Sequence, residues 1–178
     1  FFGTNPDALE RAFLTKGRSL VQGLENLIRD LEANDGELLV RLADESAFKV
    51  GSDLAATPGK VVFRNRLFEL IQYTPSTEKV YYTPLLMFPP WINKFYILDL
   101  RANNSLIRWI VDQGYTLFVV SWVNPDSTYS NVGLEDYIEQ GYLEAIDQVK
   151  SICKVKKINA LGYCIAGTTL SLIMSIMS

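Results

Sequence analysis

Histidine is absent from all 178 residues of this sequence, and cysteine occurs only twice, at Cys153 and Cys164. A complete triad of nucleophile, histidine and carboxylate is therefore excluded within these residues. Two cysteines are too few for a disulfide framework, so we expect both to be free thiols. The sequence also lacks a cluster of residues with the spacing of metal ligands.

Basic residues are not in excess either, since 17 lysines and arginines stand against 20 carboxylates and give a net charge of −3. This balance argues against binding to a nucleic acid backbone. No apolar run reaches the length of a membrane span, and the first residues do not have the pattern of a signal peptide. With 48% hydrophobic residues, the composition is typical of an intracellular globular protein, and we expect a cytoplasmic location.

The region 1–59 is predicted to be helical and rich in turns. Asn5 is a typical helix cap and Pro6 suits the first helical position, whereas Gly17 predicts a break. Apolar residues recur at helical spacing until an Asn-Asp-Gly stop, at Leu9, Phe13, Leu20, Leu24, Leu27 and Leu31. We therefore expect an amphipathic helical N-terminal region.

The region 60–178 changes to short strands that alternate with helices, which is typical of an α/β fold. The expected strands are 60–65, 67–73, 84–88, 115–120 and 158–163, and the expected helices are 104–113, 134–152 and 168–177. The first two strands read as an antiparallel pair, and the others as buried strands of a mostly parallel sheet with crossover helices. The loops after Phe88, Val120 and Tyr163 should then converge on one cleft.

The most informative motif is GYCIAG at 162–167, which lies between an apolar run and a helix-forming stretch. Strand, sharp turn and helix in this order are typical of a nucleophile elbow, here with Cys164 where a lipase has serine. Gly162 and Ala166 are small enough for so tight a turn. The start of the following helix should favour the thiolate of Cys164. The alternative is that Cys164 is a buried structural cysteine at a strand end. Cys153 is expected to lie at a helix end and to have no role in catalysis.

In the architecture that carries this elbow, a histidine base and its orienting carboxylate follow the nucleophile in the chain. The sequence reaches Ser178 without a histidine. We therefore expect a truncated catalytic chain whose acid and base lie further on. Alone, it should be inactive and poorly stable, because the strand before the elbow would keep an open edge.

Three blocks carry a family resemblance: PLLMFPPWINKFYILDL at 84–100, SWVNPD at 121–126 and LGYCIAGT at 161–168. Together they resemble the polyhydroxyalkanoate synthases, most closely the short-chain, single-subunit class I type. The resemblance implies an α/β-hydrolase fold, of which 60–178 is the N-terminal part of the catalytic domain. It also implies homodimers that polymerise (R)-3-hydroxyacyl-coenzyme A, with 3-hydroxybutyryl-coenzyme A as the expected substrate, into cytoplasmic polyester granules. No cofactor is expected, because the coenzyme A thioester is itself the substrate.

The same resemblance implies a covalent thioester on Cys164, which the hydroxyl group of a second unit then attacks. The backbone N–H of Ile165 would be one oxyanion donor. The second donor should come from the loop after Phe88, and we choose Ile92. The alternative is that this loop is only an apolar wall. The family's glycine two residues after the cysteine is here Ala166, which is still small.

Four side chains are predicted to bind substrate: Trp91, Asn93, Trp122 and Asp126. For Trp122 the alternative is a core residue, and for Asp126 an ordinary turn. Two other functions stay open. One is a cysteine thioesterase of the same fold, and the other is a non-catalytic docking module that uses the N-terminal helix at a granule surface.

Overall fold

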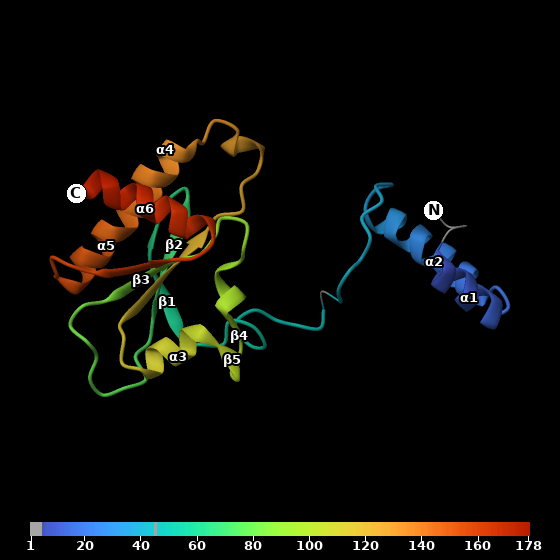
Figure 1. Cartoon of the computed structure of the whole chain (residues 1–178), viewed down its shortest axis with the longest axis horizontal. Helices are drawn as coiled ribbons and strands as arrows, with labels where there is room; N and C mark the ends of the chain where they lie inside the picture. Colours follow the sequence, from blue (N-terminus) through green and yellow to red (C-terminus); the bar gives the residue numbers. More distant parts are fainter. Residues whose placement is uncertain (1–4, 45) are drawn as a thin grey trace. The chain divides into compact units, whose positions relative to one another are not determined.

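The computed structural model describes residues 5–44 and 46–178 (Figure 1). The chain divides into two compact units between Ala47 and Phe48, which is earlier than the boundary expected after residue 59. The segment before the first strand belongs to the second unit, because the backbone N–H of Ala55 donates to the carbonyl of Asp99 at 2.8 Å. Within the described residues, no helix has the length and apolar character that crossing a membrane requires.

The first unit contains two helices, α1 (Pro6–Leu14) and α2 (Arg18–Ala33). The side chain of Asn5 accepts a hydrogen bond from the N–H of Ala8 at 3.2 Å, and Pro6 follows it, so the predicted cap is confirmed. The predicted break near Gly17 is also confirmed. No residue of either helix is buried, so the apolar faces of these helices form no core within this unit.

The second unit contains a five-stranded sheet in the order β1-β2-β6-β3-β7. The strands are β1 (Gly59–Arg64), β2 (Phe68–Tyr73), β3 (Leu85–Phe88), β6 (Leu117–Trp122) and β7 (Asn159–Gly162). β1 pairs with β2 in antiparallel fashion as predicted, and β2 is also antiparallel to β6. β3 is parallel to both β6 and β7. The sheet is therefore mixed, the α/β class is confirmed, and β7 lies at an edge.

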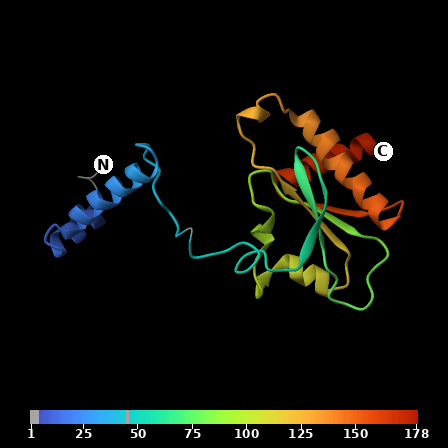
Figure 2. The same ribbon diagram turned by 180° about the vertical axis from the view of Figure 1, so that it is seen from behind.

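Helices cover both faces of this sheet (Figures 1 and 2). α3 (Leu106–Asp112) packs on one face, and α5 (Glu144–Cys153) and α6 (Ile165–Met177) pack on the other. Alternate residues of each buried strand point to opposite faces. In β3, for example, Leu86 and Phe88 belong to the core under α5 and α6, whereas Met87 belongs to the core under α3.

Several short elements complete the unit. They are η1 (Phe95–Leu98), the hairpin of β4 (Asp99–Arg101) and β5 (Asn104–Ser105), η2 (Ser127–Tyr129), α4 (Leu134–Asp136) and η3 (Tyr137–Leu143). η3 is a π-helical segment that joins α4 to α5. The helix predicted over 134–152 is thus present, with a wider central turn than the α-helical spacing predicts. α6 begins at Ile165, three residues before the predicted start at Thr168.

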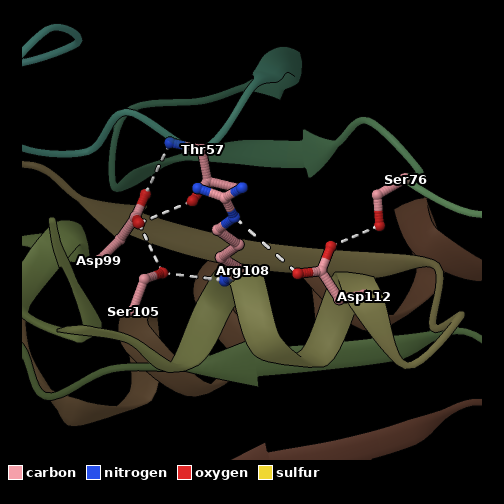
Figure 3. Close-up of polar contacts among 6 residues, drawn as sticks. All are labelled: Thr57, Ser76, Asp99, Ser105, Arg108 and Asp112. Atoms are coloured by element: carbon pink, nitrogen blue, oxygen red, sulfur yellow. Dashed lines mark hydrogen bonds and ion pairs between the residues drawn. The ribbon is translucent and has the colours of Figure 1, made fainter. Parts of the chain in front are cut away.

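Asp99 ties the segment before β1 to the start of α3, and only 2% of its surface is exposed. Its carboxylate accepts hydrogen bonds from the hydroxyls of Thr57 at 2.7 Å and Ser105 at 2.6 Å, and from the N–H of Thr57 at 3.3 Å (Figure 3). Ser105 also caps α3. Near the other end of the helix, Ser76 donates to the carboxylate of Asp112 at 2.6 Å. The two hydrogen bonds from Thr57 attach the segment before β1 to the α/β unit.

Candidate active site

β7 runs into α6 through a strained turn at Cys164. The backbone of Cys164 has φ 57° and ψ −135°, a conformation that residues other than glycine rarely adopt. The thiol is free and exposed. The sharp strand-to-helix turn predicted from the sequence is therefore present, and it has the geometry of a nucleophile elbow. The role of Cys164 as a nucleophile stays a prediction.

Small residues make this turn possible. A Cβ atom on Gly162 would lie 2.7 Å from the carbonyl oxygen of Ala166 and 2.9 Å from its carbonyl carbon, so no side chain fits at this position. Ala166 is itself fully buried. The backbones of β7 and of the first turn of α6 are thus in direct contact, which gives the physical reason for the small residues two positions on either side of Cys164.

The residues beside Cys164 differ in their surroundings. Ile165 is the first residue of α6, where a backbone N–H has no partner within the helix, as the predicted oxyanion donor requires. The hydroxyl of Tyr163 is buried and has no hydrogen-bond partner among the described residues. Burial, and to a smaller extent the nearby Cys164, raise the pKa of the Tyr163 hydroxyl to about 12.

The loop after β3 leaves the sheet beside the elbow, because Phe88 pairs with Gly162 across the parallel strands. The N–H of Asn93 donates to the carbonyl of Pro90 at 3.2 Å and closes a turn. Ile92, in this turn, is 91% exposed. Its backbone N–H as second oxyanion donor stays a prediction.

Trp91 is half-buried, and its ring lies 5.2 Å from that of Tyr137 in η3. Its indole Nε1 is buried without a partner among the described residues. Asn93 is also half-buried. Contact of either side chain with a substrate stays a prediction.

The loop after β6 is joined to the loop after β3. The indole Nε1 of Trp122 donates to the carbonyl of Pro89 at 2.8 Å, and the ammonium group of Lys94 donates to the side-chain oxygen of Asn124 at 2.9 Å. Since Phe88 also lies opposite the end of β7, the three loops leave the sheet at the same edge. That they line one cleft stays a prediction. Trp122 is 8% exposed and lies in the core, as in the alternative interpretation, and its contact with a substrate stays a prediction.

Asp126 caps the short helix η2. Its carboxylate accepts hydrogen bonds from the hydroxyl of Thr128 at 2.6 Å and from the N–H of Thr128 at 2.9 Å. These bonds hold the pKa of Asp126 below its ordinary value. Both bonds are local, as an ordinary turn requires, and a role in binding substrate stays a prediction. Cys153 is the last residue of α5, at a helix end as expected, and burial raises the pKa of its thiol.

Two features of this region escaped the sequence interpretation. The bond between Trp122 and Pro89 joins residues 33 positions apart, and a carbonyl acceptor leaves no trace in a residue pattern. The π-helical geometry of η3 was also missed, although π-helical turns are frequent at functional sites. The fully buried Tyr142 within η3 stacks on Phe88 with ring centroids 4.3 Å apart, so this segment supports the strand that leads to the loop.

Residues 1–110 match the family model described as the N-terminus of poly-beta-hydroxybutyrate polymerase, PhaC. The poly(3-hydroxyalkanoate) polymerase of Methylorubrum extorquens is 49% identical over 98% of this chain and 29% of its own length. The chain belongs to the poly(3-hydroxyalkanoate) polymerase family. The family resemblance carried by the three sequence blocks is thereby confirmed.

Another member of the poly(3-hydroxyalkanoate) polymerase family, the polymerase subunit PhaC of Cupriavidus necator, is 44% identical over 100% of this chain and 30% of its own length. The similarity therefore extends through the turn at Cys164, beyond the residues that the family model matches. The chain spans about 30% of the length of these curated relatives.

Proposed function

We propose that these residues form the nucleophile-bearing part of a longer poly(3-hydroxyalkanoate) polymerase. This enzyme would join (R)-3-hydroxyacyl units, with 3-hydroxybutyryl-coenzyme A as the expected substrate, and release coenzyme A. The observation that carries the proposal is the exposed thiol of Cys164 on a strained strand-to-helix turn, in a chain whose relatives are named as polymerases.

The fold that we propose is the α/β-hydrolase fold. The parallel strands β6, β3 and β7 support this assignment, together with helices on both faces of the sheet and an elbow at the carboxyl end of β7. This end of a parallel sheet is where α/β folds bind their ligands.

In the first chemical step, the thiolate of Cys164 attacks the carbonyl carbon of the acyl-coenzyme A. A new carbon–sulfur bond forms, the bond to the coenzyme A sulfur breaks, and coenzyme A leaves as a thiolate. One thioester replaces another, so the step is close to isoenergetic. The negative charge on the carbonyl oxygen would be stabilised by the backbone N–H groups of Ile165 and Ile92.

In the second step, the hydroxyl of another hydroxyacyl unit attacks the thioester. A carbon–oxygen bond forms, the thiolate of Cys164 is released, and the hydroxyl proton passes to a general base. We propose that this base is a histidine of the longer chain, because these residues contain none. No cofactor takes part in either step. Trp91, Asn93 and Asp126 are the proposed contacts of the substrate, and the enzyme is proposed to act as a homodimer at the surface of cytoplasmic polyester granules.

Labelled 3-hydroxybutyryl-coenzyme A tests the proposed nucleophile in the full-length polymerase. We expect covalent label on the wild-type protein in a denaturing gel and none on Cys164→Ala. The matched control is Cys153→Ala, which should keep its label because Cys153 lies at the end of α5 and not in an elbow. Label on the Cys164→Ala variant would exclude Cys164 from the mechanism.

Product analysis separates polymerisation from hydrolysis. A polymerase releases coenzyme A and leaves the acyl groups in a polyester. A thioesterase of the same fold would release equal amounts of coenzyme A and free 3-hydroxybutyrate, and this result would favour the hydrolase over the polymerase.

A further inference from the structure

We propose that Trp122 is a positioning residue, which fixes the loop after β3 against the end of β6 and so sets the position of the second oxyanion donor. This inference rests on the proposed function, because the loop matters to catalysis only if acyl transfer takes place at Cys164. It assigns to Trp122 a role in holding protein backbone, in place of contact with the substrate.

The first step of the argument is the bond itself. Trp122 is the last residue of β6, and its Nε1 donates to the carbonyl of Pro89, the first residue after β3, at 2.8 Å. Both residues are buried. Since Pro89 and Pro90 have no backbone N–H, neither can be held through a backbone donor. The carbonyl of Pro89 is therefore the group by which the start of this loop is held, and the buried indole supplies its donor.

A second contact fixes the other end of the loop. The ammonium group of Lys94 donates to the side chain of Asn124 at 2.9 Å, and Asn124 follows β6 by two residues. The loop 89–94 is thus attached at both ends to the same segment. Ile92 lies between the two attachments and is 91% exposed.

The indole ring of Trp122 is held by close packing. Its ring centroid lies 5.5 Å from that of Tyr137 and 5.4 Å from that of Tyr142, both in η3. A Cβ atom on Gly141 would lie 3.0 Å and 3.1 Å from the Cζ3 and Cη2 atoms of the indole. The π-helical segment therefore fits closely against the ring, and a methyl group on Gly141 would require the indole to move by a few tenths of an ångström.

Such precision matters because an oxyanion donor acts on the transition state, so a displaced donor lowers kcat and leaves substrate binding largely intact. A misplacement of about 1 Å can cost on the order of 100-fold in rate. A side chain that only stabilised the fold would not separate kcat from KM in this way.

The test uses Trp122→Phe in the full-length polymerase, which keeps an aromatic ring and removes the donor. We expect kcat to fall by at least about tenfold, with KM changed by less than about twofold. Alkylation of Cys164 by iodoacetamide needs no oxyanion donor, so its rate should stay unchanged. The matched control is Trp109→Phe in α3, where the indole is exposed, and it should alter none of these quantities.

A second variant, Gly141→Ala, keeps the indole N–H and displaces its ring. It should lower kcat by a smaller factor than Trp122→Phe, at unchanged KM and unchanged alkylation, and it decides the matter if Trp122→Phe does not fold. An unchanged kcat in Trp122→Phe would overturn the inference. So would a loss of kcat together with slower alkylation, since that reports a general disturbance of the site. Failure of the proposed function is seen separately, as the absence of acyl label on Cys164 in the wild-type enzyme.

Discussion

The turn at Cys164 and the cluster around Asp99 belong to the same α/β unit, but the polar group is exposed in the first and buried in the second. At Cys164 the backbone is strained and the thiol is exposed. At Asp99 the carboxylate is buried and accepts three hydrogen bonds, from Thr57 and Ser105. Strain persists only where the surroundings enforce it, and it gathers at functional sites. A buried carboxylate with satisfied oxygens contributes instead to stability. The comparison thus separates a group suited to chemistry from a group suited to holding the fold.

The largest expected effect is that of Cys164→Gly in the full-length polymerase. We expect activity to fall by at least about 10⁴-fold, because the nucleophile is lost. Stability should rise by about 1 kcal/mol, because glycine adopts a positive φ without strain. Turnover assays and chemical denaturation measure the two quantities. A loss of stability would show that the strain relieved at Cys164 is smaller than the cost of the chain entropy that glycine adds to the unfolded state.

Asp99→Ala should lower stability and leave activity unchanged, which is the opposite of the result expected for Cys164→Gly. It leaves the hydroxyls of Thr57 and Ser105 and one N–H without their acceptor, and we expect a loss of about 3 kcal/mol in the free energy of unfolding. Activity per folded molecule should be unchanged. The matched control is Asp112→Ala, in which an exposed carboxylate at the end of α3 is removed, with an expected change of about 0.5 kcal/mol or less. Equal effects of the two substitutions would contradict the role given to Asp99.

Ala166→Val should lower both activity and stability, unlike the substitutions at Cys164 and Asp99, which should each lower only one of them. Ala166 is fully buried, and its carbonyl lies against Gly162. A larger side chain should cost about 1–3 kcal/mol of stability and disturb the turn at Cys164, whereas Ala166→Gly should be tolerated. Normal turnover and melting temperature in the valine variant would show that the turn has more room than the structure indicates.

The sequence predicted those parts of this picture that depend on local pattern. The cap at Asn5, the antiparallel pair of β1 and β2, and the sharp turn at Cys164 each have a signature in adjacent residues. The helix-forming stretch 168–177 predicts the start of α6 at Thr168. The structure begins the helix at Ile165, since the turn at Cys164 redirects the chain within one residue.

What the sequence could not predict depends on contacts between distant residues. The boundary between the two units lies at residue 47 because backbone and side-chain groups of Ala55 and Thr57 bond to Asp99. The attachment of Pro89 to Trp122 is of the same kind. The bond from Ala55 to Asp99 and the bond from Trp122 to Pro89 both end on a backbone carbonyl, which every residue possesses, so no residue pattern reveals either bond.

The smallest expected effect concerns the two thiols. Cys153 is half-buried, and burial raises the pKa of its thiol, whereas Cys164 is exposed. Because the thiolate is the form that reacts, and burial both shields the Cys153 thiol and keeps more of it protonated, we expect iodoacetamide at pH 8 to modify Cys164 faster than Cys153. A raised pKa leaves more of Cys153 protonated at this pH, so its rate should keep rising above pH 9, where an ordinary thiol begins to level off. In urea, where burial is lost, the two rates should become similar.

Mass spectrometry of the two cysteine peptides gives both rates in one sample. Equal rates in the native protein would mean that the turn does not present Cys164 to solvent, and would remove the contrast between an exposed, strained group and a buried one.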